Sequence, residues 1–356
     1  MPAATTTRTT PIRTGLIGFG LAGRVFHGPF LATHPAFRLD VISTSSPERA
    51  AEALADHPEA TVVSSPEELL ARAADLDLVV LASPVTAHLE QGLAALDAGL
   101  AVVIDKPFVP TVLEAKKLIA RAEEVGALLT VFQNRRWDAD FLTLRGMVAE
   151  GLLGRVHRFE STFERWGKPV ADRWQDSTPA SLGGGIAFDL GSHLVDQALQ
   201  LFGPAEVELA EFRSVREGSG NEDDAVIALR HRDGVFTHLT MSRVAGQSGP
   251  RFRVLGDASA FVSYGLDVQE PQLKAGIWPD HDDYGLTPEF AWGTLGVDGG
   301  GPLDRVPLAR GDYPAFYDGV AAAMLDGAPA PVVPRDALEV VRIIERAHAL
   351  AAARTT

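Results

Sequence analysis

The chain contains no cysteine among its 356 residues. Disulfide bonds and thiolate metal sites are therefore excluded, and the composition suits a reducing compartment, so we predict a cytoplasmic protein. The ten histidines show no metal-ligand spacing supported by neighbouring carboxylates, and we expect no structural metal.

Positive charge is scarce, and long apolar runs are absent. Lys and Arg number 32 against 47 Asp and Glu, which gives a formal net charge of -15. No basic block offsets this charge, which argues against a nucleic-acid partner. No apolar run approaches the length of a membrane span, so we expect no membrane association. Residues 1–11, rich in Thr and Ala, predict a disordered tail and not a signal peptide.

Near its start the chain carries a glycine series after an apolar run. Residues 12–17 predict a strand, the glycines have the spacing G-x-G-x-x-G, and residues 25–33 predict a helix. In such a unit the first glycine permits the turn, the second lets a pyrophosphate approach, and the third lets the helix pack on the strand. A turn without a ligand is the plainer alternative. We expect the following residues to bind a dinucleotide: Gly18, Phe19, Gly20, Leu21, Ala22 and Gly23.

The end of the second predicted strand, residues 37–42, should read the ribose of that dinucleotide. Asp40 has the expected distance from the glycines, but the strand continues beyond it. The strand end itself carries no carboxylate, and Ser45, Ser46 and Arg49 can bind a 2′-phosphate. We therefore predict NADP as the preferred cofactor, with NAD possible. Arg49 can equally be a solvated helix residue.

Strands and helices alternate as far as residue 132 and are joined by short turns. Further strands are predicted at 61–63, 76–82, 100–104 and 127–132, with helices at 47–57, after the N-cap Ser65, and at 111–125. This alternation predicts an α/β Rossmann domain, a doubly wound parallel sheet with ligands at the carboxyl ends of its strands. At those ends we expect Ser83, Pro84, His88 and Lys106 to line the cofactor site. His88 can instead cap its helix, and Lys106 can be a surface lysine.

Beyond residue 132 a helix at 141–150 is followed by strands without intervening helices. These strands are predicted at 156–166, 205–215, 224–230, 235–244, 251–255 and 260–264. They predict a C-terminal α+β domain with a mainly antiparallel open sheet. Residues 267–314, rich in Gly, Pro and Asp, predict a long loop region that could cover a pocket. We assign 12–132 to the dinucleotide-binding domain, 133–335 to a substrate and oligomerisation domain, and 336–354 to a helix that packs back on the protein.

A second functional stretch begins at three consecutive glycines, residues 183–185. Asp189 and His193 follow, four residues apart, so on a helix they share one side, away from its apolar face. A solvated polar face is the alternative. Three glycines cost backbone entropy, however, and close approach to a ligand would explain them. Hydride transfer from an alcohol also requires removal of a proton from its oxygen, and Lys106, Asp189 and His193 can provide this as catalytic residues.

The glycine series, Asp105-Lys106-Pro107 and the triple glycine with Asp189 and His193, in this order, resemble the Gfo/Idh/MocA family of NAD(P)-dependent oxidoreductases. The resemblance covers nearly the whole chain, although Asp105 stands where that family has glutamate. Within the family, segments at 105–108, 131–138 and 264–267 are similar to bacterial NADP-dependent scyllo-inositol dehydrogenases. Aldose dehydrogenases share most of these segments.

The resemblance implies reversible oxidation of a secondary alcohol on a cyclic polyol or sugar of the inositol type. It implies His193 as general base or acid, Lys106 as the group that orients and polarises the reacting oxygen, and Asp189 as a partner of substrate and lysine. Members of the family differ on whether lysine or histidine holds the proton.

Three further residues are candidates for binding the other hydroxyl groups: Asn134, Arg135 and Trp174. Trp174 can instead be a core residue, and Arg135 can form an ion pair at the domain junction. The resemblance implies a small polyol or sugar as one partner and a second copy of the chain as another, bound through the C-terminal sheet in a homodimer or homotetramer. The alternatives are an aldose dehydrogenase, a non-catalytic dinucleotide-binding sugar sensor, or a reductase of a non-sugar substrate.

Overall fold

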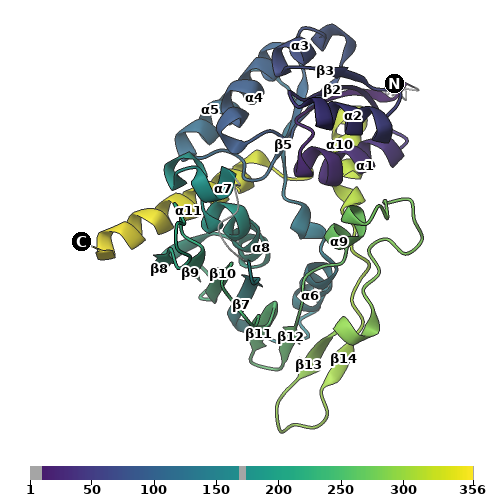
Figure 1. Cartoon of the computed structure of the whole chain (residues 1–356). Helices are drawn as coiled ribbons and strands as arrows, with labels where there is room; N and C mark the ends of the chain where they lie inside the picture. Colours follow the sequence, from purple (N-terminus) through teal and green to yellow (C-terminus); the bar gives the residue numbers. More distant parts are fainter. Residues whose placement is uncertain (1–9, 168–173, 356) are drawn as a thin grey trace, which may run out of the picture.

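The computed structural model describes residues 10–167 and 174–355, arranged around two sheets (Figure 1). The first sheet has six parallel strands in the order β3-β2-β1-β4-β5-β6. Its strands are β1 (Ile12–Ile17), β2 (Phe37–Ser43), β3 (Thr61–Val63), β4 (Leu78–Leu81), β5 (Ala101–Asp105) and β6 (Leu129–Phe132). Because β1 pairs with both β2 and β4, the strand order reverses there, and ligands of such sheets bind at this reversal. The predicted doubly wound parallel sheet is confirmed.

Helices cover both faces of this sheet, which explains why β4 and β5 are apolar without alternation. They are α1 (Gly28–Thr33), α2 (Pro47–Asp56), α3 (Pro66–Leu70), α4 (His88–Asp97) and α5 (Val112–Val125). Ser65 caps α3 as predicted, and Thr111 and Glu114 form a reciprocal capping box on α5. The first helical segment begins earlier than predicted, at Ala22, with a π-helix (Ala22–His27) that runs directly into α1.

The second sheet has eight strands in the order β14-β13-β12-β11-β7-β10-β9-β8. Its strands are β7 (Val156–Glu164), β8 (Ala205–Arg213), β9 (Asp224–His231), β10 (Phe236–Ser242), β11 (Phe252–Gly256), β12 (Ala260–Ser263), β13 (Gly293–Gly296) and β14 (Asp304–Val306). Among the described strand pairs of this second sheet, only β7 and β10 run parallel to each other. The predicted, mainly antiparallel sheet is therefore confirmed. Helices α6 (Ala139–Ala149) and α8 (Ser192–Phe202) contribute apolar side chains to the core of this domain.

Residues 267–314 contain more regular structure than the predicted loop region. Helix α9 (Gln269–Lys274) borders the cavity described below, and β13 and β14 extend the second sheet as a projecting hairpin (Figure 1). The sequence gives little sign of these two strands, because they are short and rich in glycine and charge.

The last two helices connect the domains. Helix α10 (Pro314–Asp326) follows the second sheet in sequence, yet Phe316 and Tyr317 lie in the core of the first domain, so this segment packs outside the domain assigned to it. Helix α11 (Pro334–Thr355) packs on both cores, through Val341 on the first and Ile344 on the second. The short helices are Ala73–Asp75, Val85–Ala87, Asn134–Trp137, α7 (Trp174–Ser177), Ala180–Leu182, Ala187–Gly191 and Glu289–Ala291.

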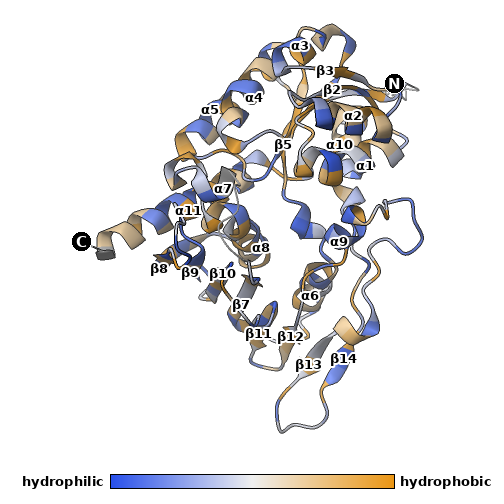
Figure 2. Cartoon of the chain, in the orientation of Figure 1, coloured by the Kyte–Doolittle hydropathy of each residue, from blue (hydrophilic) through white to orange (hydrophobic). Residues whose placement is uncertain are grey.

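Apolar residues run through the strands around β5, and polar residues lie on the outer turns of the helices (Figure 2). Among the described residues, no helix combines the length and apolar character that a membrane crossing requires.

Candidate active site

A cavity of about 850 Å³ lies between the carboxyl ends of the first sheet and the second domain. From the first domain the glycine loop after β1 and the ends of β2, β4 and β5 line it. From the second domain come Phe163, Arg165, Asp189, His193 and the helix α9. The cavity therefore lies where the strand order of the first sheet reverses, as expected for a doubly wound sheet.

The three glycines of the loop each have a separate structural reason. Gly18 has a φ of +96°, and a Cβ there would lie 2.7 Å from the carbonyl oxygen of Ala82. A Cβ on Gly23 would lie 2.0 Å from the carbonyl oxygen of Gly18, so this residue allows the helix to pack against the loop. A Cβ on Gly20 would meet only the guanidinium of Arg49, at 3.8 Å. The open side of Gly20 lines the cavity and fits a dinucleotide pyrophosphate.

The rim after β2 carries hydroxyls and one arginine. Ser45 and Arg49 line the cavity, and among the described residues Arg49 has no ion-pair partner. Ser46 is not among the lining residues, and its hydroxyl accepts a hydrogen bond from the backbone N–H of Arg49, which caps α2. Asp40 is turned away and pairs with Arg38 at 2.6 Å. The rim nearest the β2 end thus has no carboxylate among its lining residues.

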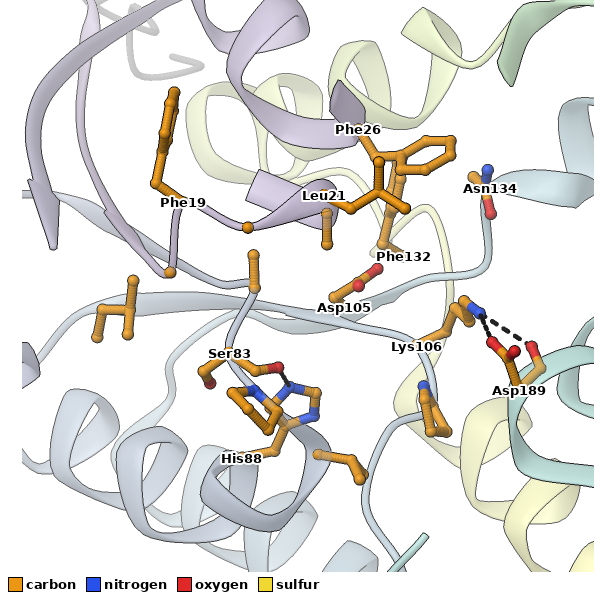
Figure 3. Close-up of a pocket in the computed structure, with 18 of the residues that line it drawn as sticks. Phe19, Leu21, Phe26, Ser83, His88, Asp105, Lys106, Phe132, Asn134 and Asp189 are labelled. Atoms are coloured by element: carbon orange, nitrogen blue, oxygen red, sulfur yellow. Dashed lines mark hydrogen bonds and ion pairs between the residues drawn. The ribbon is translucent and has the colours of Figure 1, made fainter. Parts of the chain in front are cut away.

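The imidazole of His88 bridges the segments that follow β4 and β5 at the cavity (Figure 3). Its Nε2 lies 3.0 Å from the carbonyl oxygen of Ser83 and its Nδ1 lies 3.0 Å from that of Phe108. Ala87, and not His88, is the N-cap of α4, so the capping alternative is wrong. Ser83, Pro84 and His88 all line the cavity.

Lys106 crosses from the end of β5 to the second domain (Figure 3). Its Nζ donates to the carbonyl oxygen of Asp189 at 2.9 Å and to Oδ1 of the same residue at 3.5 Å. The other carboxylate oxygen, Oδ2, lies 3.6 Å from Nη1 of Arg243. The Asp189 carboxylate is therefore held between two cations, and Lys106 is held beside the cavity.

His193 is buried on the cavity wall, and neither ring nitrogen has a hydrogen-bond partner among the residues described. Its ring stacks with Phe163 at a centroid distance of 6.3 Å. Burial lowers the pKa of His193 well below its usual range, and the charges of Lys106, Arg135, Arg251 and Arg165 lower it further. The imidazole is therefore neutral at neutral pH and able to accept a proton.

Asp105 forms part of the cavity beside Lys106. His27 is fully buried, with Nδ1 2.7 Å from the hydroxyl of Tyr317 and Nε2 3.6 Å from Oδ1 of Asp105. Burial alone would raise the pKa of Asp105, but the neighbouring His27 and the charge of Lys106 outweigh burial and lower it. Asp105 is thus held ionised, and a carboxylate remains where the family motif has glutamate.

Two family models match this chain. The model of the oxidoreductase family with an NAD-binding Rossmann fold matches residues 12–133. The GFO/IDH/MocA C-terminal domain matches residues 141–262. The chain belongs to the Gfo/Idh/MocA family.

The relatives match almost the whole length of this chain. The uncharacterized oxidoreductase YdgJ of Escherichia coli is 39% identical over 338 residues, 94% of this chain and 94% of that protein. The scyllo-inositol 2-dehydrogenase (NADP(+)) IolW of Bacillus subtilis is 35% identical over 339 residues, 94% of this chain and 92% of that protein. The solved structure of the oxidoreductase yvaA from Bacillus subtilis has a TM-score of 0.90 at 33% identity and covers 97% of both chains. This is an NAD(P)-binding oxidoreductase fold.

The cavity of this Gfo/Idh/MocA chain brings together most residues that the sequence singled out. The predicted residues that line it are Gly18, Phe19, Gly20, Leu21, Ala22, Ser45, Arg49, Ser83, Pro84, His88, Lys106, Asn134, Arg135, Asp189 and His193. Gly23 and Ser46 do not line it. Trp174 begins α7, and its side chain lies outside the described part of the structure.

Two sequence-based interpretations need correction. The glycines at 183–185 do not face the cavity: a Cβ on Gly184 would lie 1.7 Å from the carbonyl oxygen of Thr178, and one on Gly185 would lie 2.2 Å from Glu222. Their close approach is to the chain itself. The polar face after His193 is solvated only in part, because Asp196 is buried and pairs with Arg136 at 2.6 Å, whereas Gln200 is exposed.

The two alternatives given for Arg135, a position at the binding cavity and an ion pair at the domain junction, are both observed. Arg135 lines the cavity and also pairs with Asp138 at 3.3 Å and with Glu270 at 2.7 Å. Residues that the sequence did not single out include Phe163, Arg165, Glu270 and Lys274. The i,i+4 spacing of Glu270 and Lys274 is a helical signal within the segment interpreted as a loop.

Proposed function

We propose that this protein catalyses the reversible oxidation of a secondary alcohol on a cyclic polyol or sugar of the inositol type, with NADP as its preferred cofactor. The observation that carries the proposal is the meeting of Lys106, Asp189 and His193 at one cavity that also opens onto Gly20. The printed name of the relative IolW, an NADP-dependent scyllo-inositol 2-dehydrogenase, supports the same substrate class.

In this proposal the residues of the chain orient the substrate and move its proton. When bound, the nicotinamide supplies the acceptor or donor for the hydride. The ammonium of Lys106, positioned by Asp189, donates a hydrogen bond to the reacting oxygen and stabilises negative charge on it. The neutral His193 takes the hydroxyl proton during oxidation and returns it during reduction. Asn134 and Arg135 bind other hydroxyl groups from the side of the domain junction.

The preference for NADP rests on the rim after β2. Ser45 and Arg49 line the cavity and can bind a 2′-phosphate, whereas Asp40 does not line it and pairs with Arg38. NAD, which lacks that phosphate, would leave the Arg49 guanidinium without an anionic partner.

We also propose that the second sheet pairs with another copy of the chain in a dimer or tetramer. Apolar side chains are exposed on segments that adjoin its outer strands, with Tyr264 64%, Phe290 84% and Val297 56% exposed. Light scattering during size-exclusion chromatography tests this, and a monomer at micromolar concentration would contradict it.

Absorbance of the reduced nicotinamide, recorded with NADP and then NAD across inositols, aldoses and their keto forms, tests the reaction. Activity on an inositol or ketoinositol supports the proposal and identifies the cofactor. Activity on aldoses alone would favour an aldose dehydrogenase. If fluorescence titration shows that the cofactor binds but no polyol is turned over, the proposed dehydrogenase gives way to a sensor or to a reductase of another substrate.

A further inference from the structure

Positive side chains outnumber negative ones at the second-domain end of the cavity. The lining cations there are Lys106, Arg135, Arg165 and Lys274, and the lining carboxylates are Asp189 and Glu270. The remaining lining carboxylate, Asp105, faces His27 in the first domain. This local excess of positive charge is opposite in sign to the formal net charge of the chain, which is -15.

Both carboxylates at this end already have cationic partners. Glu270 pairs with Arg135 at 2.7 Å and with Lys274 at 2.5 Å. Burial would raise the pKa of Glu270, but the nearby charges of Arg135, Lys274 and Arg165 outweigh it and lower this pKa to about 2. Asp189 lies between Lys106 and Arg243. Each carboxylate is therefore already engaged at ion-pair distance, and among the described residues a further cation at this end has no carboxylate within that distance.

Arg165 is that further cation. It directly follows β7, where its backbone N–H donates to the carbonyl oxygen of Ser242 at 2.9 Å. Its guanidinium lies over the ring of Phe163, with Cζ 5.2 Å from the ring centroid. Within the described ranges its side chain forms no hydrogen bond or ion pair, and its Nε is buried. The buried Nε therefore lacks an acceptor, and the cavity beside the guanidinium has room for a bound anion that would supply one.

The same aromatic ring links Arg165 to the site of proton transfer. Phe163 contacts the guanidiniums of Arg135 and Arg165 and stacks with the imidazole of His193. An anion at Arg165 would thus sit near His193, within the reach of one sugar-sized molecule.

We infer that the substrate carries an anionic group, a carboxylate or a phosphate monoester, and that the guanidinium of Arg165 binds it beside Phe163. Either group accepts two parallel hydrogen bonds from a guanidinium. The inference names the substrate class of the proposed reaction and rests on that proposal for the chemistry, although anion binding itself can be measured without turnover. The substrate is then a sugar acid or a phosphorylated polyol.

The competing explanation is that the cations only stabilise the alkoxide that forms when the hydroxyl loses its proton. In that case Arg165 would affect neutral and anionic substrates equally. The inference instead requires an effect that depends on the charge of the substrate.

Calorimetric titration of the full chain saturated with NADP compares glucuronate and glucose 6-phosphate with glucose, and inositol 1-phosphate with inositol. We expect at least one anionic probe to bind tenfold or more tightly than its neutral counterpart. Arg165→Gln should reduce this ratio at least tenfold, and Arg165→Lys should retain part of it. The matched control is Arg158→Gln, which removes an exposed arginine of β7, the strand that ends just before Arg165. Which probe loses more affinity distinguishes a carboxylate from a phosphate.

The inference is overturned if no anionic probe binds better than its neutral counterpart, or if Arg165→Gln and Arg158→Gln leave the same ratio. Circular dichroism of each variant confirms that it is folded. Turnover of neutral inositol with no charge preference would leave the proposed function in place and remove the inference. Charge-selective binding through Arg165 without any hydride transfer would support the inferred anion site and contradict the proposed function.

Discussion

Nζ of Lys106 donates a hydrogen bond to the backbone carbonyl oxygen of Asp189 at 2.9 Å, across 83 residues of sequence. The contact to the Asp189 carboxylate is longer, at 3.5 Å. The backbone of the second domain therefore positions the lysine that the first sheet supplies, and the carboxylate adds charge. At this junction both domains line one cavity.

Replacing Lys106 by methionine keeps the length of the side chain and removes its ammonium. We expect Lys106→Met to lower kcat by about 10²- to 10⁴-fold, the usual contribution of a positioned proton donor or acceptor. Dinucleotide affinity, measured by fluorescence titration, should change much less. Lys117→Met, at an exposed position of α5, is the control. Unchanged turnover in Lys106→Met would remove this lysine from the mechanism.

The pH profile of alcohol oxidation reports the state of His193. Because burial and surrounding cations lower the pKa of His193, the neutral base persists below the ordinary histidine range, and kcat/KM should fall only as pH drops well under about 6.5. His193→Asn should abolish this limb together with most activity. His157→Asn, at an exposed histidine of β7, should leave the profile intact. An acid limb above pH 7 in the wild type would contradict the assignment.

A carboxylate at position 45 should repel a 2′-phosphate. Ser45→Asp is expected to raise the Kd of NADP by about tenfold or more while changing that of NAD little, since one added charge at a partly solvated contact amounts to 1–2 kcal/mol, roughly. Ser46→Asp is the matched variant, because aspartate still caps α2 and position 46 does not line the cavity. Equal effects of Ser45→Asp on both cofactors would mean that the phosphate is recognised elsewhere.

Substitutions of Gly23 and Gly20 should separate an effect on the free energy of unfolding from an effect on dinucleotide binding. Gly23→Ala places a Cβ 2.0 Å from the carbonyl oxygen of Gly18, and overpacking of this kind costs about 1–3 kcal/mol of the free energy of unfolding. Gly20→Ala meets only Arg49 at 3.8 Å, so stability should hold while dinucleotide affinity falls. Urea unfolding and cofactor titration of both variants test this. A stable Gly23→Ala protein would refute the packing role.

Because of the buried carboxyl group of Glu222, we expect the free energy of unfolding to depend on pH. Burial raises the pKa of Glu222 from its ordinary value near 4.5 to about 7, so the native state retains a proton that the unfolded state releases. The free energy of unfolding must therefore fall as pH rises through this window. Glu222→Gln should match the wild type at pH 4 and be more stable at pH 8.5, by up to about 3 kcal/mol. His348 faces Glu222 at 3.7 Å, and proton uptake there would reduce the gain. A pH-independent difference would contradict the assignment.

The local sequence was sufficient for the first sheet and for the separate roles of the loop glycines. The alternation of apolar runs with capped helices is read within a few residues, and its elements pair with near neighbours in the chain. It was also sufficient to notice that Asp40 lies inside its strand, and the structure turns that side chain to Arg38. Lys106, Asp189 and His193 could be chosen because their residue types are unusual at a strand end and on a helix.

Tertiary structure alone decided how distant segments meet. The sequence determined a parallel sheet, a glycine loop open to a dinucleotide and three candidate catalytic side chains. It could not show that α10 returns to the first core, that Gly184 is needed against Thr178, or that Arg165 has no side-chain acceptor among the described residues while Glu270 is paired twice. The physical reason is that periodicity and propensity are local, whereas burial, charge pairing and close packing depend on surfaces that come together only when the two domains fold onto each other.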